Sequence, residues 1–469
     1  MKKILWLSAT LCLLSTTFLQ AQHVTQRLEK DIPVLMKDAM IPGMSMALIE
    51  NGKITWHHHW GFQNATTKIP VTDSTVFEAA SLTKVVTAYA VLKLADQGKI
   101  NLDTPLNRYL GNSYDVKNDD RINQITARHV LTHSAGFPNW RQENSDTLPI
   151  LFTPGEKFSY SGEGFVYVSR VAEKLTGMKF EDYVKKVVFK PLHMNNSSFT
   201  WQPGFERRQI HRHDWMGDVS FRFEGPGSNA AASMRTTATD YARFIIALMN
   251  GTGLKKETWQ EMFTPQIAVN KESAPGVSWG LGVGLEPIDN DIYFWHWGDQ
   301  GDSKCYFTAQ LKKKNGVVYF TNSKNGLAIT SQVLAETIGG KHPAVAWLEY
   351  PKFNPAGPKL LEAIKKQGVE PALQNYRHQR ENGGVHIEED MINSIGYQLL
   401  RAKNIDAAIA VFKQNADDFP KSGNVWDSLA EGYMIKGNKQ LAIEYYEKSY
   451  ELDPSNVNAL VLIKKLKGE

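Results

Sequence analysis

Alternating apolar positions predict two β-hairpins, one near each end of the first 340 residues. Apolar residues recur over residues 44–49 and, after Asn51-Gly52, over residues 54–56. Asn-Gly between two such runs is typical of a tight hairpin, because both residues tolerate positive φ. A second hairpin is predicted over residues 306–320, where a Lys-Asn-Gly turn separates two further apolar runs.

Helical segments are predicted between the two hairpins. Residues 81–97 have the pattern of a long apolar helix that ends at Gly98, and most of residues 100–265 is predicted to be helical segments joined by loops. A further helix is predicted over residues 327–338. Strands at both ends of a helical middle indicate a mixed α/β (α+β) domain whose sheet is completed late in the sequence.

The residues beyond about 345 are predicted to be helical and contain an internal repeat. Prolines at 351, 355 and 358 mark a linker. Four residue types recur at an offset of 34 positions: Asn404 and Asn438, Ala408 and Ala442, Ile409 and Ile443, Pro420 and Pro454. This period, with small residues at helix contacts and proline after the second helix, resembles the tetratricopeptide repeat, whose units stack on their neighbours. The alternative is an unrelated helical bundle.

The first residues have the pattern of a secretory signal peptide. Two lysines precede an apolar run over residues 4–19, and Ala21 offers a small residue for cleavage. The run is shorter than the roughly 20 residues of a membrane-spanning helix, although an uncleaved anchor is the alternative. We therefore expect a bacterial protein exported to the periplasm or secreted, with no membrane span once the signal is removed. Cys305 would then be the single remaining cysteine, since Cys12 lies within the signal.

These patterns divide the chain into four predicted segments. They are a signal peptide over residues 1–21, a mixed α/β domain over residues 22–345, a linker with a degenerate helical pair over residues 346–387, and repeats over residues 388–469. Composition adds only exclusions. With 42% hydrophobic and 22% charged residues the chain is of ordinary globular type, and a net charge of +4 gives no support for a nucleic-acid partner.

Ser81 and Lys84 are the first candidates for chemistry. They are three residues apart at the start of the predicted helix and therefore share one of its faces. A lysine whose pKa is lowered there can take the serine proton, and the free N–H groups of the first helical turn can hold an oxyanion. The alternative for so short a motif is a solvated surface pair.

Two further stretches carry candidate residues. Tyr160 follows a Pro-Gly turn, and near a lysine ammonium its phenolate would be favoured and could act as a general base. A packing tyrosine is the alternative. His296 and Gly298 lie on a predicted strand over residues 295–299, where a small residue lets a substrate backbone approach closely. The alternative is an ordinary aromatic-rich strand.

Taken together, S-x-x-K, then Y-S-x, then H-x-G resemble the serine β-lactamase and penicillin-binding-protein superfamily, in particular the class C β-lactamase-related hydrolases. Residues 98–106, 125–137 and 234–244 resemble other stretches of that family, so the resemblance spans about residues 28–340. It implies an antiparallel sheet flanked by helices with an all-helical subdomain, followed here by the tetratricopeptide-like module. It also implies an acyl-enzyme mechanism that needs no metal and no organic cofactor.

The resemblance also implies roles for individual residues. Ser81 would be the nucleophile, and Lys84 and Tyr160 would share proton transfer. His296 would stand where many members have lysine, lining the pocket and steering a substrate carboxylate or the Tyr160 hydroxyl. The backbone N–H groups of Ser81 and of Asp299, just after Gly298, would form the oxyanion hole.

Two departures from the family pattern bear on the substrate. Gly162 stands where many members have an asparagine whose amide binds the acyl-amide chain of β-lactams and peptidoglycan stems, so efficient β-lactam hydrolysis is not expected. Asp299 and Asp302 would place two carboxylates near the pocket mouth and disfavour an anionic substrate. We expect an exported serine hydrolase acting on an ester, an amide or a D-amino-acid peptide. The alternatives are a β-lactamase or DD-carboxypeptidase, and a catalytically weak ligand-binding protein that signals through its repeats.

Two histidine patterns are compatible with a metal site, but a structural role without a metal is preferred for both. His57 and His59 share one face of a predicted strand, with no matching carboxylate obvious in the sequence, and His129 and His133 lack the glutamate that a zinc-protease motif needs between them. We expect a solvated strand face and a structural turn. The expected partners are a small-molecule or peptide substrate, and a protein partner or a second copy bound through the repeats.

Overall fold

A computed structural model describes residues 24–142, 145–220, 227–270, 272, 274–350 and 353–468. The predicted signal peptide, residues 1–21, lies outside these residues. The chain divides into two compact units, of which the second holds the residues from Phe353 onward together with Asp214–Met216.

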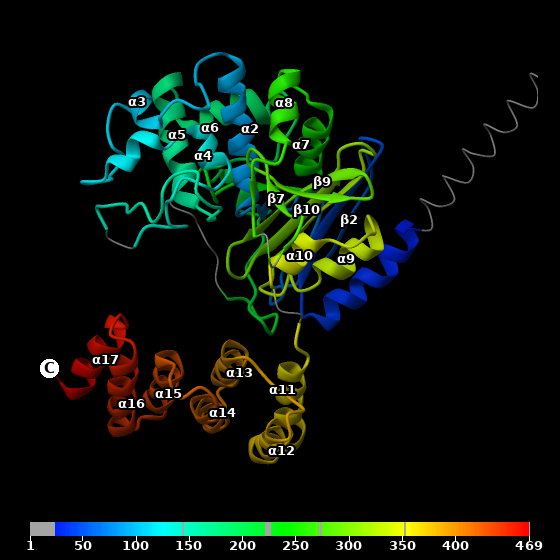
Figure 1. Ribbon diagram of the computed structural model, residues 1–469. Coiled ribbons are helices and arrows are strands. Elements are labelled where there is room, and N and C mark those ends of the chain that lie inside the picture. Colours follow the sequence, from blue (N-terminus) through cyan, green and yellow to red (C-terminus); the bar gives the residue numbers. More distant parts are fainter. Residues whose placement is uncertain are drawn as a thin grey trace, which may run out of the picture. The chain divides into compact units, whose positions relative to one another are not determined.

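The first unit is built on an antiparallel sheet, as predicted (Figure 1). Within the described residues the sheet has nine strands in the order β3-β2-β1-β11-β10-β9-β8-β7-β6. Its strands are β1 (Gly43–Glu50), β2 (Lys53–Asn64), β3 (Ile69–Pro70), β6 (Ile267–Ala268), β7 (Ser278–Trp279), β8 (Gly284–Ile288), β9 (Asp291–Asp299), β10 (Lys304–Gln310) and β11 (Gly316–Thr321). Because β1 pairs with β11 from Met44↔Thr321 to Ile49↔Gly316, the sheet is completed late in the sequence.

Both predicted hairpins are present. Asn51 and Gly52, between β1 and β2, have φ of 51° and 73°, the positive values that their turn requires. Lys314, before β11, also has a positive φ, of 55°. Local turn chemistry therefore sets the two hairpins whose inner strands, β1 and β11, lie side by side in the sheet.

Helices cover both faces of the sheet. α7 (Ala238–Asn250) packs on β1, β2 and β11, and on the opposite face α9 (Thr330–Thr337) lies beside a helix over residues 24–38, to which Arg27 joins it by an ion pair with Glu336 (Figure 1). β1 is accordingly buried on both faces. The remaining helices of four or more residues in this unit are α2 (Leu82–Asp96), α3 (Leu106–Leu110), η1 (Asp120–Gln124), α4 (Ala127–Leu131), α5 (Gly162–Thr176), α6 (Phe180–Val184), η2 (Lys185–Phe189), α8 (Lys256–Met262) and α10 (Pro343–Trp347).

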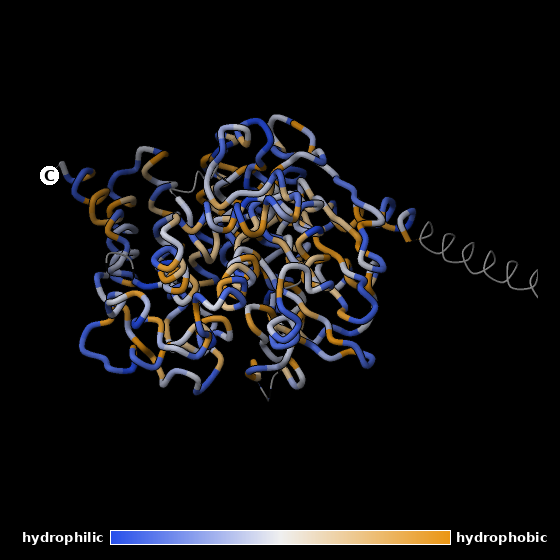
Figure 2. The backbone as a smooth tube through the Cα atoms, turned by 90° about the horizontal axis from the view of Figure 1, so that it is seen from above, coloured by the Kyte–Doolittle hydropathy of each residue, from blue (hydrophilic) through white to orange (hydrophobic). Residues whose placement is uncertain are grey.

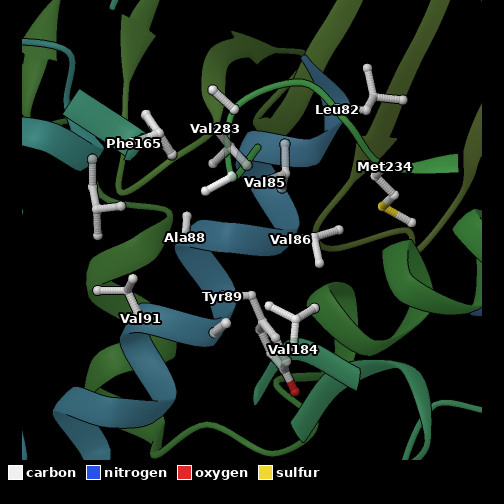
Figure 3. Packing of buried hydrophobic residues seen from close by; sticks show 14 of the residues in the cluster. Leu82, Val85, Val86, Ala88, Tyr89, Val91, Phe165, Val184, Met234 and Val283 are labelled. Atoms are coloured by element: carbon white, nitrogen blue, oxygen red, sulfur yellow. The ribbon is translucent and has the colours of Figure 1, made fainter. Parts of the chain in front are cut away.

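The predicted helix over residues 81–97 is α2, and it is buried on nearly all sides. A helix that is apolar around its whole circumference needs neighbours on every side. Figure 3 shows Val85, Val86 and Tyr89 packed among side chains from other segments, including Phe165 and Val283. α2 is therefore a rigid base for any residue placed at its first turn.

The second unit consists of helical pairs that match the predicted repeats. Asn404 and Asn438 precede the second helix of successive pairs, Ala408 and Ala442 are fully buried, and a proline follows each of those helices. The helices are α11 (Ala356–Gln367), α12 (Val369–Glu381), α13 (Glu389–Arg401), α14 (Ile405–Asp418), α15 (Gly423–Lys436), α16 (Lys439–Leu452) and α17 (Val457–Lys467).

Hydrophobic and hydrophilic segments alternate along the chain, with hydrophilic segments on the outer loops (Figure 2). In the part of the chain that the structure describes, no helix combines the length and the hydrophobicity needed to cross a membrane.

Candidate active site

Ser81 stands at the entrance to α2, directly after a strained turn. Ala80 has a φ of 44°, in the left-handed region that a side chain disfavours. Short strands β4 (Phe77–Glu78) and β5 (Arg235–Thr236) pair just before this turn, and Ala79 N–H donates to the Met234 carbonyl at 2.8 Å. The turn therefore holds the half-buried Ser81 hydroxyl at the N-terminal end of a rigid helix.

Lys84 lies one helical turn beyond Ser81 and is fully buried. Its Nζ is 3.0 Å from Ser81 Oγ and donates to the Ala231 carbonyl at 2.9 Å. Burial disfavours the ammonium and lowers the pKa of Lys84 from its ordinary 10.5 to about 7. A neutral amine can donate to Ala231 and still accept the Ser81 proton, so the pair is equipped for general-base activation of the serine.

Tyr160 completes this cluster with its ring centroid 4.8 Å from Lys84 Nζ. Its hydroxyl oxygen is buried and makes no hydrogen bond of standard geometry with a described residue. Burial raises the pKa of Tyr160 well above its ordinary value, and the opposing effect of a hydrogen bond with the nearby Ser81 is smaller. The expectation of a favoured phenolate is therefore wrong. Tyr160 is a neutral phenol at pH 7, which suits a proton donor, because the desolvation of its oxygen outweighs the effect of its hydrogen bond with Ser81.

Gly298 lets β9 pack directly against the segment that precedes Ser81. A Cβ at this position would lie 2.7 Å from the Ala79 carbonyl oxygen and 2.3 Å from Cys305 Sγ. No residue with a side chain fits there without a shift of the backbone. The contact places the end of β9, with Asp299, along the same pocket as Ser81.

His296 lies behind this surface rather than on it. The side chain is fully buried, and Nδ1 is 2.7 Å from the Trp297 carbonyl oxygen. Burial, reinforced by the charge of Lys84, lowers the pKa of His296 to about 3. A neutral, buried imidazole cannot steer a substrate carboxylate by charge, so that part of the expectation is wrong. The ring lies 6.1 Å from that of Tyr160 and supports it from one side.

The pocket in front of Ser81 has a volume of about 910 Å³. Its described lining residues are Glu78, Ser81, Asn139, Trp140, Tyr160, Gly227, Ser228, Asn229, Ala232, Ser233, Met234, Arg235, Trp297, Asp299, Gln300, Gly301 and Tyr350. Ser81, Tyr160 and Asp299 thus share its wall, whereas Lys84, His296 and Gly298 lie behind it. Gly162 does not line it either, because the indole of Trp140 covers this glycine.

Cationic side chains compensate the negative charges of the carboxylates at this pocket. This finding corrects the expectation that these carboxylates disfavour an anionic substrate. Asp299 forms an ion pair with Lys304, the residue opposite it on β10, and accepts a hydrogen bond from the Tyr350 hydroxyl at 2.7 Å. Glu78 accepts two hydrogen bonds from the buried Arg212, at 2.7 and 3.0 Å. Asp302 is not among the described lining residues.

His133 contacts Tyr160 from a second side, and sequence reasoning missed it. Its ring centroid lies 4.3 Å from that of Tyr160. The Ser161 N–H donates to His133 Nδ1 at 3.0 Å, and the Ser159 N–H donates to the His133 carbonyl at 2.7 Å. These bonds fix the backbone on both sides of the tyrosine. The position of His133 within residues 125–137, a stretch that resembles the family, is the sequence signal that could have identified this role.

The histidines on β2 face a carboxylate that the sequence did not reveal. His57 Nδ1 and His59 Nδ1 lie 3.2 and 3.1 Å from the same oxygen of Asp73; His57 and Asp73 are exposed to solvent and His59 is half-buried. Among the described residues, no group of three or more histidines, cysteines and acidic residues is arranged to hold a metal ion.

The lowered pKa of Lys84 predicts an acid limb in the pH dependence of kcat/KM. If neutral Lys84 is the base, the active fraction falls about tenfold for each pH unit below about 7. Burial lowers the pKa values of His133 and His296 well below this range, so neither can produce the limb. Initial rates of ester hydrolysis between pH 5.5 and 8.5 measure it, and a flat profile over that range would rule out Lys84 as the base.

Two solved structures have folds similar to that of the first unit. The octameric penicillin-binding protein homologue from Pyrococcus abyssi superposes with a TM-score of 0.60 at 24% identity, covering 72% of this chain and 82% of that one. D-alanine carboxypeptidase AmpC from Burkholderia cenocepacia gives a TM-score of 0.57 at 18% identity, covering 67% of this chain and 99% of that one. At these identities the likeness establishes the fold.

Curated relatives carry related names. "Penicillin-binding protein 4*" of Bacillus subtilis is 27% identical over 269 residues, which are 50% of this chain and 58% of the relative. "Protein flp" of Staphylococcus aureus is 26% identical over 190 residues, 37% of this chain and 38% of the relative. The chain thus spans between about two fifths and three fifths of the length of these relatives. "Beta-lactamase" of Escherichia coli is 26% identical over 298 residues, 60% of this chain and 76% of the relative.

Family models match a segment in each of the two units. Residues 423–456, within α15 and α16 and just beyond, match the tetratricopeptide repeat model. Residues 28–332, more than half of the chain and including Ser81, Lys84, Tyr160 and β9, match the model described as Beta-lactamase. The chain therefore belongs to the beta-lactamase family.

Proposed function

We propose that this chain is an exported serine hydrolase that transfers the acyl group of an ester, an amide or a D-amino-acid peptide to Ser81 and then to water. One observation carries the proposal: a fully buried lysine amine, with a pKa of about 7, lies 3.0 Å from a serine hydroxyl that opens into a pocket. At pH 7 about half of the molecules hold such an amine in its neutral form, which can act as a base at physiological pH.

Acylation uses all three members of the cluster. Ser81 Oγ attacks the substrate carbonyl carbon while its proton moves to Lys84 Nζ. The N–H groups of Ser81 and Asp299 stabilise the resulting oxyanion. The Tyr160 hydroxyl gives its proton to the leaving group and regains one from the Lys84 ammonium, so one proton passes in net from Ser81 to the leaving group.

Deacylation repeats these steps with water in place of Ser81. Lys84, again neutral, accepts a proton from a water molecule that attacks the acyl carbon. The bond between this carbon and Ser81 Oγ then breaks, and Lys84 returns the proton to Oγ. The products are a carboxylic acid and the free serine.

The repeats support a second role, in binding a protein. Stacked tetratricopeptide-like pairs present extended surfaces, and the match over residues 423–456 supports a protein partner or a second copy of the chain as the ligand. Export is proposed from the apolar run over residues 4–19 and the small residue Ala21 that follows it.

A panel of three substrates tests the proposed activity. It consists of a p-nitrophenyl ester, a D-alanyl-D-alanine peptide and a chromogenic cephalosporin, each measured with the wild-type chain at pH 8. We expect the ester to have the highest kcat/KM and the cephalosporin the lowest, because Trp140 occupies the space beside Gly162. A cephalosporin turned over faster than the ester would instead support a β-lactamase. No turnover of any of the three would support a catalytically weak ligand-binding protein.

A further inference from the structure

The pocket has an aromatic wall, of which the proposed chemistry uses only the Tyr160 hydroxyl. Of its lining residues, Trp140, Tyr160, Trp297 and Tyr350 are aromatic. We define these four side chains as the aromatic wall. We propose that the aromatic wall is a subsite for an uncharged aromatic acyl group, such as phenylacetyl, and that Trp140 sets this preference. The proposal rests on the proposed function, because it names the acyl group that Ser81 would receive.

Trp140 is a large apolar side chain that stays 44% exposed while lining the pocket. Covering such a surface with an apolar group is favourable because it removes apolar area from water. Aromatic pairs add specific stacking geometry to this gain. Tyr160 and Trp297, with ring centroids 4.8 Å apart, continue the wall toward Ser81.

The indole is held in place by both of its chain neighbours. The Asn139 carbonyl accepts hydrogen bonds from the N–H groups of Gly162 and Glu163, at 2.9 and 3.1 Å. On the other side, the Arg141 guanidinium bonds both oxygens of Glu163, at 3.1 and 2.9 Å. The backbone around Trp140 is thus tied to the first turn of α5, and a fixed ring loses little entropy when a ligand stacks on it.

Gly162 gives the indole the space that it occupies. A Cβ at position 162 would lie 2.6 Å from Trp140 Cη2 and 2.8 Å from two further indole carbons. Any side chain at this position must displace the ring. The departure from the family pattern at Gly162 and the position of Trp140 are therefore two parts of one feature.

The charges around the pocket favour an uncharged acyl group. Each charged side chain among its described lining residues already has a partner: Glu78 bonds Arg212, Asp299 pairs with Lys304, and Arg235 stacks over Trp201 at 5.3 Å. A charged acyl group would exchange its hydration for a wall whose two carboxylates are already paired and whose guanidinium already stacks on an indole ring. An aromatic group loses no such hydration.

Two esters with the same leaving group test the proposal kinetically. We expect wild-type kcat/KM to be about 10- to 100-fold higher for p-nitrophenyl phenylacetate than for p-nitrophenyl acetate. Trp140→Ala should reduce this ratio at least tenfold. Gly162→Ala should also reduce it, but should change nothing further once Trp140 is alanine. Trp56→Ala, a half-buried tryptophan on β2 outside the pocket, should leave the ratio unchanged. Thermal unfolding verifies that each variant is folded.

Binding to the Ser81→Ala variant provides a readout that needs no turnover. Saturation-transfer NMR should give phenylacetamide at least tenfold higher affinity than acetamide, and Trp140→Ala should remove the difference. A ratio of the two esters that Trp140→Ala leaves within twofold, or equal binding of the two amides, would overturn the subsite while leaving the hydrolase proposal intact. Selective phenylacetamide binding, with no turnover of the ester, the D-alanyl-D-alanine peptide or the cephalosporin by the wild-type chain, would refute the hydrolase proposal and uphold the subsite.

Discussion

Replacing Ser81 with alanine is expected to lower kcat/KM for a p-nitrophenyl ester by about 10⁴-fold or more. The substitution removes the atom that accepts the acyl group, and the Lys84 amine cannot replace it because Lys84 is buried behind the pocket. The fold should persist. Ser81 is half-buried, and its hydroxyl interacts with the neighbouring Lys84 rather than with the core. Initial rates and a thermal unfolding curve measure the two quantities.

Ser74→Ala is the matched control for this substitution. Ser74 is an exposed serine in the same unit and is outside the pocket lining, so its removal should leave kcat/KM unchanged. If the Ser81→Ala variant retained more than a few per cent of wild-type activity, another residue would be the nucleophile.

Replacing Lys84 with methionine is expected to inactivate the enzyme and, at the same time, to stabilise its folded state. Activity should fall about 10³-fold or more, because Lys84 accepts the Ser81 proton in the proposed mechanism and Tyr160, the other group beside Ser81, is kept protonated by burial. Stability should rise because a pKa lowered from 10.5 to about 7 means that burying the Lys84 ammonium costs about 5 kcal/mol. The Ala231 carbonyl loses its donor, at a cost of about 1–3 kcal/mol, so we expect a net gain of about 2–4 kcal/mol.

The gain in stability from Lys84→Met should depend on pH in a defined direction. Between pH 7 and 10.5 the unfolded chain holds the Lys84 proton while the folded chain does not, so wild-type stability from this group rises with pH in that window. The advantage of Lys84→Met is therefore largest at or below pH 7 and shrinks toward pH 10. Denaturant unfolding at pH 6.5 and pH 9.5 measures it, with the exposed Lys99→Met as the control. An advantage that did not change between the two pH values would contradict a lowered pKa.

Features that depend on local sequence were predictable. The spacing of Ser81 and Lys84 on one helix sets their contact, and the turn residues Asn51 and Gly52 set the first hairpin. The period of 34 positions located the helical pairs of the repeats. Each of these follows from backbone geometry over a few residues or from exact recurrence along the chain.

Features that depend on distant segments were not predictable. The phenol of Tyr160 stays protonated because His133, Trp279 and Trp297, from three separate segments, pack around it and exclude water. The same exclusion of water keeps His296 neutral. The edge strand β6 escaped prediction because it is only two residues long. Trp140 in a loop closely contacts Gly162 in the first turn of α5, and no periodic pattern in the sequence predicts this contact.

The central claim is that Ser81 carries the acyl group during turnover. Rapid acid quenching of the reaction with p-nitrophenyl phenylacetate, followed by intact-mass measurement and peptide mapping, tests it directly. The account predicts a mass increase of one phenylacetyl group on the wild-type chain, located on Ser81 and missing from Ser81→Ala. An acyl group mapped to any other residue, or ester turnover by Ser81→Ala at the wild-type rate, would contradict it.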